Sequence, residues 1–269
     1  MVRALSFDLK GYFERIGYSE NGGAPLERLR QVHFRHMLSI PFENLNVYLK
    51  KEISLTPEDI ERKFLVERRG GYCFEQNALF FLALSEMGFQ VKPLVVRLFR
   101  QGTGFAGFTH RQNMVQIGSD RYAVDVGYGG NCFTLPVKLE FGTVQEQTHA
   151  TYRVVEDDTD SYDYIVQILD KDTGEFVNMV AILDTPATDE DFIIGNFYTS
   201  QNPASFFRGH IMCSLYTETG RHSLFDNRLT VLENGGTRVI EVTQDSLGDI
   251  LKEYFMLDVQ GIALPPQGV

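Results

Sequence analysis

Residues 69–79 read RGGYCFEQNAL and are the most informative stretch of the chain. Their glycine pair permits a sharp turn directly before Cys73. Apolar residues then recur at helical spacing as far as Gly88, a C-terminal stop, which predicts a helix over residues 74–87. Cys73 is thus expected at a helix N-terminus, where unpaired N–H groups and the macrodipole favour a thiolate nucleophile over a thiol. The alternative is a small, buried and inert cysteine.

The composition predicts a globular protein that works in a reducing compartment. A length of 269 residues with 43% hydrophobic content suits one large domain or a few small ones. No run of about 18 apolar residues and no N-terminal secretion signal occurs, so we expect neither a membrane span nor export. The three cysteines, Cys73, Cys132 and Cys213, cannot all pair and lack zinc-binding spacing. Free thiols, no metal and a cytoplasmic location are therefore expected.

The net charge of −11 comes from one segment. Residues 156–191 hold 12 of the 36 acidic residues and one lysine, whereas acidic and basic residues balance elsewhere. We expect this segment to form a solvated face and its loops. Nucleic acid is not expected as a partner, because phosphate backbones need a basic surface. An anionic small molecule still fits the balanced remainder, and the oligomeric state is left open.

Helical patterns occupy the first third of the chain, and strand patterns follow. Besides the helix after Cys73, predicted helices span residues 7–16, 26–38 and 56–67. Runs rich in β-branched and aromatic residues predict strands at 91–99, 111–117, 122–126, 152–156 and 164–169. Beyond Asn196 we expect two more strands and a last helix, at 229–232, 238–242 and 246–254. Helices before strands indicate an α+β fold with segregated layers, the strands forming an antiparallel sheet or barrel.

A thiolate nucleophile needs a base and a group that orients the base. Among six histidines, His110 opens a predicted strand after a glycine-rich approach, and Asp125 interrupts the apolar strand that returns beside it. A buried carboxylate is costly unless it is paired, and a ring N–H of His110 would satisfy Asp125. The alternatives are a core histidine and a strand-end aspartate.

The connection between these two strands tests the pairing. A two-residue loop at residues 119–120 would put His110 and Asp125 on the same face of the sheet. They would still lie four residues apart, roughly 13 Å at ~3.3 Å per residue, which is too far for a hydrogen bond. The pairing therefore requires a longer loop, a bulge, or a bend at His110.

Five short signatures, in order along most of the chain, resemble the arylamine N-acetyltransferase family. They are IPFENL at 40–45, RGGYCFE at 69–75, TH at 109–110, VDVGYG at 124–129, and NFY, PASF and CSL at 196–198, 203–206 and 213–215. The resemblance implies a helical bundle at 1–88 that carries the nucleophile, a β-barrel at 89–195 that carries the histidine and aspartate, and an α/β lid at 196–269. It also implies a Cys-His-Asp triad of the kind found in transglutaminases and papain-like proteases.

The resemblance further implies ping-pong acetyl transfer. Cys73 takes the acetyl group from acetyl-CoA, His110 relays protons and Asp125 holds His110, before an arylamine, arylhydrazine or arylhydroxylamine attacks the thioester. The matching substrate positions are Phe42, Thr109, Tyr128 and Phe206, although Phe207 is an equal candidate to close the pocket. The matching CoA positions are Gly107, Tyr198 and Ser205. At Ala204 this chain lacks a hydroxyl that some members carry, and Tyr128 stands where many have Phe.

Other readings of the same residues stay open. A papain-like protease or transglutaminase would use the same triad order, although residues 40–45 and the last signature argue against it. An amide synthase acting on a carrier-bound thioester would need an open pocket without affinity for CoA. A non-enzymatic binding module is disfavoured because all three triad residues are present. Glycines 127–130 suit a turn at least as well as a phosphate contact, and Arg69 with Glu43 is expected to form a structural ion pair.

Overall fold

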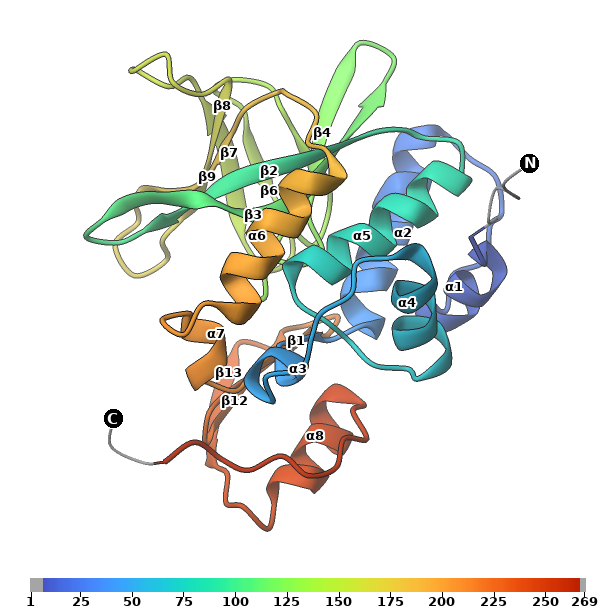
Figure 1. The fold of residues 1–269 in the computed structure, drawn as a ribbon. Helices are drawn as coiled ribbons and strands as arrows, with labels where there is room; N and C mark the ends of the chain where they lie inside the picture. The colour runs from blue at the N-terminus through green and yellow to red at the C-terminus, as the bar shows by residue number, and fades with distance from the viewer. Residues whose placement is uncertain (1–6, 267–269) are drawn as a thin grey trace.

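Helices fill the first third of the chain in the computed structural model, which describes residues 7–266 (Figure 1). They are α1 (Leu9–Ile16), α2 (Pro25–Ser39), α3 (Leu45–Tyr48), α4 (Pro57–Glu61), a π-helical turn (Arg62–Val66) and α5 (Cys73–Glu86). The predicted helices are confirmed to within a few residues. At the start of α4, the Thr56 side chain accepts a hydrogen bond from the Asp59 backbone N–H, which is the expected cap. α5 ends where Gly88 adopts a φ of +84°, a conformation that favours glycine.

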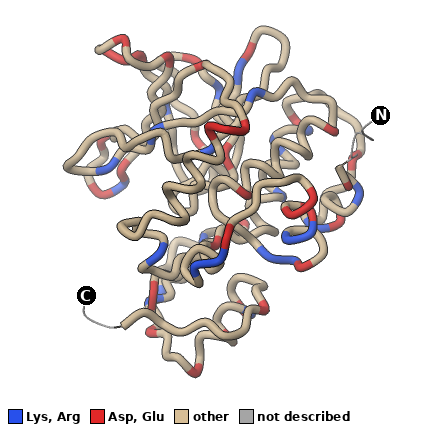
Figure 2. Tube along the Cα trace, in the orientation of Figure 1, with Lys and Arg blue, Asp and Glu red and all other residues tan. Residues whose placement is uncertain are grey.

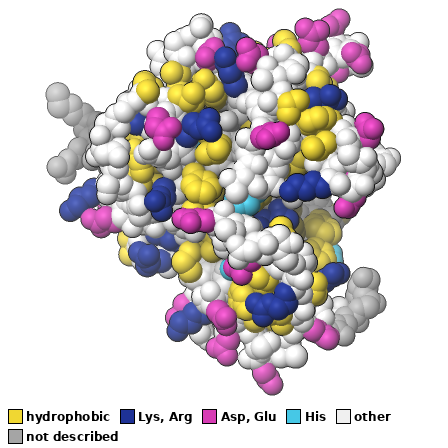
Figure 3. All heavy atoms as spheres, turned by 180° about the vertical axis from the view of Figure 1, so that it is seen from behind, with side chains coloured by type: hydrophobic (Ala, Val, Ile, Leu, Met, Phe, Trp, Pro, Cys, Tyr) yellow, Lys and Arg dark blue, Asp and Glu magenta, His cyan; other side chains and the backbone are white. Residues whose placement is uncertain are grey.

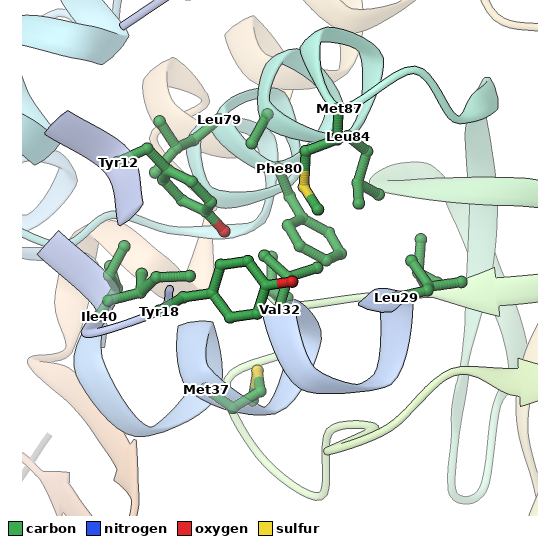
Figure 4. Packing of buried hydrophobic residues seen from close by; sticks show 14 of the residues in the cluster. Tyr12, Tyr18, Leu29, Val32, Met37, Ile40, Leu79, Phe80, Leu84 and Met87 are labelled. Carbon is green, nitrogen blue, oxygen red and sulfur yellow. The ribbon is translucent and has the colours of Figure 1, made fainter. Parts of the chain in front are cut away.

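The helical core lies between α5 and α2 (Figure 4). Leu79, Phe80 and Leu84 of α5 are fully buried against Leu29 and Val32 of α2. Each such side chain contributes about 1.5–3 kcal/mol by leaving water. This packing fixes the start of α5, and therefore Cys73, relative to the rest of the molecule.

Eight antiparallel strands form one strongly curved sheet, a nearly closed barrel. Its order is β5-β4-β3-β2-β9-β8-β7-β6. The strands are β2 (Gln90–Arg100), β3 (Gly104–Ile117), β4 (Asp120–Val124), β5 (Val137–Lys138), β6 (Val144–Glu146), β7 (Thr151–Val155), β8 (Tyr164–Leu169) and β9 (Phe176–Ile182). The α+β class is therefore confirmed. The strand predicted to open at His110 begins earlier, because the glycine-rich approach is part of β3, where Gly104, Phe105 and Phe108 pair with β2.

The β3–β4 hairpin differs from the loop considered above by one residue. Ile117 pairs with Asp120, so the turn is Gly118-Ser119, with Gly118 at a φ of +61°. With Asn113 opposite Val124, Asp125 follows the strand at the level of Gln112. His110 is thus about two residues, or roughly 7 Å, along the same face. β3 also bulges: His110 and Phe108 pair with consecutive β2 residues, so Thr109 is the extra residue.

The C-terminal part contains α6 (Asp189–Gln201), α7 (Phe206–Gly209) and α8 (Leu247–Phe255), with four strands. The strands are β10 (Met212–Tyr216), β11 (Arg221–Phe225), β12 (Arg228–Glu233) and β13 (Gly236–Glu241). Only the last two were predicted. The sheet order is β1-β10-β11-β12-β13, so β1 (Phe42–Glu43) from the helical part joins its edge. α6 crosses beside β2 and β3 in Figure 1, and the predicted boundary at 195/196 falls inside this helix. The three-unit division stays a prediction.

Acidic positions gather at the β7–β8 turn in the upper left of Figure 2, where Asp158, Asp160 and Asp163 are exposed. This confirms the solvated acidic segment. The reverse face mixes acidic and basic side chains (Figure 3). Within residues 7–266, no helix combines the length and apolar character required to cross a bilayer.

Candidate active site

Cys73 is the first residue of α5, and the turn before it is fixed by close contacts. A Cβ on Gly70 would lie 2.0 Å from the Pro41 carbonyl oxygen, so no other residue fits there without movement. The Glu43 backbone N–H donates to the Gly71 carbonyl at 3.0 Å. Glu75 accepts from the Tyr72 N–H at 3.2 Å, which closes the first turn. The glycine pair therefore sets the nucleophile loop against the residues around β1.

Four buried or nearly buried charges brace this loop from behind. Arg69 donates to Glu43 at 2.6 Å, which confirms the predicted ion pair. Lys63 lies 2.6 Å from Glu75 and 4.0 Å from Glu43. Burial opposes ionisation of Glu43, but Lys63 and Arg69 outweigh it and hold the pKa of Glu43 below its ordinary value. For Glu75, burial prevails over the single contact with Lys63 and raises the pKa. The network is structural, because it links loops without reaching the cavity.

The structure brings His110 and Asp125 together. The His110 Nε2–H donates to Asp125 Oδ2 at 2.6 Å, and both side chains are buried. The shorter hairpin offset and the bulge at Thr109 supply the bend that the pairing requires. With Nε2 used, Nδ1 is the ring nitrogen left for Cys73, and the closeness of Cys73 helps to raise the pKa of His110. The structure therefore brings the three predicted triad residues together, with Cys73 and the paired His110 lining one cavity.

Three further donors hold the Asp125 carboxylate. The Asn77 amide and the Gly127 backbone N–H each lie 2.9 Å from Oδ1, and the Gln112 amide lies 3.3 Å from Oδ2. Asn77 and Gln112 were not predicted. Their spacing from the triad residues could have identified them. Asn77 lies one helical turn after Cys73, and Gln112 lies two strand positions after His110, so each shares a face with a triad residue.

Charge complementarity sets the ionisation of the pair. Burial alone would lower the pKa of His110, but the Asp125 charge, the hydrogen bond to it and the contact with Cys73 raise it to about 10. Burial likewise disfavours the Asp125 carboxylate, yet His110 and the hydrogen bonds from His110, Asn77 and Gly127 hold its pKa below the ordinary range. The resting pair is thus an imidazolium and a carboxylate.

A cavity of about 460 Å³ opens over Cys73 and His110. Six other residues predicted for substrate or CoA line it: Phe42, Thr109, Tyr128, Tyr198, Ser205 and Phe206. Gly107 does not line it and lies on β3 nearby. Both Phe206 and Phe207 face the cavity, so the choice between them does not arise. Residues that the sequence reasoning missed include the end of β2, namely Leu98, Phe99 and Arg100.

The other two cysteines lie outside this cavity. All three cysteines are free and buried. Burial raises the pKa of both Cys132 and Cys213 well above the ordinary thiol value, so neither is poised as a nucleophile. The Cys132 thiol donates to the Asp125 backbone carbonyl at 3.0 Å, as the His33 ring does at 3.0 Å. Within residues 7–266, no group of three His, Cys, Asp or Glu side chains is arranged to hold a metal ion.

The chain is similar to known proteins over most of its length. Residues 25–264 match a family described as N-acetyltransferase. The arylamine N-acetyltransferase of Escherichia coli K12 is 33% identical over 254 residues, which cover 94% of this chain and 87% of that protein. The solved arylamine N-acetyltransferase of Salmonella typhimurium superposes with a TM-score of 0.87 at 31% identity, covering 96% and 94% of the two chains. The Mycobacterium marinum enzyme, solved in complex with CoA, gives 0.85 at 29% identity, covering 93% of each.

Proposed function

Because the chain belongs to the arylamine N-acetyltransferase family, we propose that Cys73 carries an acetyl group from acetyl-CoA to an aromatic amine. The acceptors are arylamines, arylhydrazines and arylhydroxylamines, and the reaction is ping-pong. The observation that supports this most strongly is that His110, paired with Asp125 at 2.6 Å, lines the same cavity as Cys73. The M. marinum relative binds CoA, which supports acetyl-CoA as the donor. Three free thiols support a cytoplasmic location.

In the first half-reaction, the Cys73 thiolate attacks the acetyl carbonyl carbon of acetyl-CoA. The N-terminus of α5 presents unpaired N–H groups near the oxygen that becomes negative. As the carbon–sulfur bond to CoA breaks, His110 gives its Nδ1 proton to the leaving sulfur. The products are free CoA and an acetylated Cys73 beside a neutral His110.

In the second half-reaction, the amine nitrogen attacks the same carbonyl carbon. Neutral His110 takes a proton from that nitrogen, and the Cys73 sulfur leaves as a thiolate. Asp125 holds the Nε2–H throughout, so Nδ1 always faces the reacting atoms. The resting thiolate–imidazolium pair is thereby restored, and no metal is required for any step.

Acetylation of Cys73 is the first test. We expect one acetyl group per protein after mixing with acetyl-CoA, mapped by peptide mass to Cys73 and released by aniline. Cys73→Ser should abolish it, whereas Cys132→Ser should keep it, since Cys132 is buried with a raised pKa. An acetyl group on Cys132 or Cys213, or none at all, would contradict the proposal.

The acceptor is tested by comparing amines. Phe42, Tyr128 and Phe207 give the cavity apolar walls that suit a flat ring. An aryl ring burying about 100 Å² gains on the order of 2.5 kcal/mol at ~25 cal/mol per Å². Arylamines should therefore deacetylate the enzyme nearly a hundredfold faster than alkylamines, after each rate is corrected for free-base fraction. Equal corrected rates would mean that the enzyme distinguishes arylamines from alkylamines only by their basicity.

A further inference from the structure

Asn196, in the middle of α6, forms hydrogen bonds in two directions. Its side-chain oxygen accepts from the Tyr72 hydroxyl, and its side-chain amide donates to the Ile53 carbonyl at 3.0 Å. A backbone carbonyl can only accept, so it fixes which end of the Asn196 side chain faces Tyr72. Tyr72 directly precedes Cys73 in the nucleophile loop. Asn196 therefore ties α6 both to that loop and to the segment before α4.

The side of α6 that carries this bond packs closely against the start of α5, beside which it runs in Figure 1. One residue before Asn196, a Cβ on Gly195 would lie 2.7 Å from the Phe74 ring. The two helices are therefore in contact directly after the nucleophile. A little further along α6, Tyr198 and Thr199 line the active-site cavity. The same helix thus builds one wall of the cavity and holds the loop that carries the nucleophile.

Packing restricts Tyr72 as well. Its side chain is fully buried, and a buried hydroxyl without a partner is costly, so the bond to Asn196 is required. The Tyr72 ring meets the Phe207 ring edge to face, with centroids 6.1 Å apart, and its centroid lies 5.6 Å from that of Phe74. Phe207 itself lines the cavity. Bond and packing together fix the Tyr72 side chain, and with it the backbone that leads into Cys73.

We propose that Asn196 is a positioning residue for the transfer of the acetyl group. Acting through the Tyr72 hydroxyl, it holds Cys73 where the sulfur can attack a carbonyl carbon inside the cavity. This rests on the proposed acetyl transfer at Cys73. Neither Asn196 nor Tyr72 lines the cavity, so neither touches the reacting atoms. The nucleophile loop is then held from two sides, by the ion pairs of Glu43 from behind and by Asn196 from α6.

Attack on a carbonyl carbon and attack on a saturated carbon make different demands on Cys73. An acyl donor must meet the sulfur at a defined angle with its oxygen near hydrogen-bond donors, so a displacement of about 1 Å can cost a hundredfold in rate. Iodoacetamide alkylates a thiolate by displacing iodide and needs no such donors. A displaced Cys73 should therefore lose acylation more than alkylation. A merely structural role of Asn196 would change stability and leave the ratio of the two rates unaltered.

The test measures both rates in Tyr72→Phe, Asn196→Ala and the double variant. In each single variant, acetylation of Cys73 by p-nitrophenyl acetate should slow about threefold to tenfold, as for the loss of one hydrogen bond. Alkylation of Cys73 by iodoacetamide, mapped by peptide mass, should stay near the wild-type rate. The double variant should be no slower than Asn196→Ala, because the Tyr72 hydroxyl then has no partner left to lose. Tyr48→Phe is the matched control, since it removes a hydroxyl that donates to the Ala263 carbonyl at 2.8 Å outside the cavity.

An unchanged acetylation rate in Tyr72→Phe, which keeps the buried ring, would overturn the positioning role. Equal slowing of acetylation and alkylation would also overturn it, as would additive losses in the double variant, since Asn196 would then act by another route. These outcomes leave the proposed function intact as long as acetyl-CoA acetylates wild-type Cys73. If p-nitrophenyl acetate labels wild-type Cys73 but acetyl-CoA does not, the proposed donor is wrong, and the positioning role is judged separately from the rates with p-nitrophenyl acetate.

Discussion

Asp125 shows how single residues set this chemistry. Its oxygens accept hydrogen bonds from His110, Gln112, Asn77 and Gly127, so the carboxylate has neither freedom to rotate nor an unpaired lone pair to spare. Such saturation keeps the carboxylate charged although it is buried, which in turn keeps His110 protonated. The aspartate acts through His110, and Asn77 acts through the aspartate.

We predict that Asn77→Ala lowers kcat/KM about tenfold to a hundredfold, the range expected when a charged group loses a hydrogen bond. Asn77 donates to Asp125 Oδ1 at 2.9 Å and to the Arg111 carbonyl at 2.6 Å, and it accepts from the Val126 N–H at 3.1 Å. Without Asn77, Asp125 can tilt away from His110, and the pKa of His110 falls. The basic limb of the pH–rate profile should therefore shift to lower pH. Steady-state kinetics across pH measure both effects.

Asn113→Ala is the control for this change. Asn113 is an equally buried amide that donates to the Asn77 carbonyl at 2.9 Å but does not touch Asp125. We expect a loss of about 1 kcal/mol in the free energy of unfolding and little change in the pH profile. If both variants lose activity equally, Asn77 matters only for folding.

Among the elements, the loop after β4 controls how closely the triad packs. A Cβ on Gly127 would lie 2.7 Å from Cys73 Cα and 2.9 Å from Asn77 Nδ2. Glycine is therefore required at position 127 because the backbone lies so close to the first turn of α5. A positive φ is not the reason. The helix that carries the nucleophile and the loop that follows the aspartate touch at this glycine.

We predict that Gly127→Ala destabilises the protein by about 1–3 kcal/mol, as overpacking does, and lowers turnover about a hundredfold by displacing Cys73. Thermal unfolding and single-turnover acetylation measure the two effects separately. Gly130→Ala should be nearly neutral, since a Cβ there meets only the Tyr128 ring at 3.9 Å. Equal behaviour of the two variants would refute the contact argument.

The elements also show what the sequence could and could not predict. The helix after Cys73 was predicted because a strong apolar pattern, a glycine turn and a glycine stop agree. β10 and β11 were missed because short strands with mixed burial lack a clear period, and α6 because exposed Ile193, Ile194 and Phe197 obscure its buried side. The three triad residues could be predicted from the sequence, but the contact between His110 and Asp125 could not. That contact depends on a turn one residue different from the expected one and on the bulge at Thr109. The bulge is set by the pairing of β3 with β2, which the sequence of β3 alone does not specify.

For the whole molecule, buried histidines tie stability to pH. The His36 ring accepts from the Tyr12 hydroxyl at 2.8 Å and donates to the Gln76 side chain at 2.8 Å, and the His33 ring donates to the Asp125 carbonyl. Burial lowers the pKa of His36 to about 3 and that of His33 to about 4. Both stay neutral in the folded state at pH values where the unfolded chain takes up protons.

We predict that the free energy of unfolding falls steeply as the pH drops from about 6.5 to 5. The unfolded state binds a proton at each histidine below its ordinary pKa of ~6.5, and each contributes up to about 1.4 kcal/mol per pH unit. His110, with its pKa raised to about 10, stays protonated in the folded state, so it opposes this slope near pH 6.5, where the unfolded chain is only half protonated, and contributes little toward pH 5. Urea unfolding at a series of pH values measures this dependence.

His33→Asn separates this effect from general acid sensitivity. The variant should be less stable at pH 7, because the hydrogen bond to the Asp125 carbonyl is weakened or lost. Its slope between pH 6.5 and 5 should nevertheless be smaller by up to about 1.4 kcal/mol per pH unit, since one proton-binding difference is gone. Asn113→Ala, which removes a buried hydrogen bond but no titrating group, should leave that slope nearly unchanged. An unaltered slope in His33→Asn would mean that carboxylates, and not the buried histidines, govern acid unfolding of this protein.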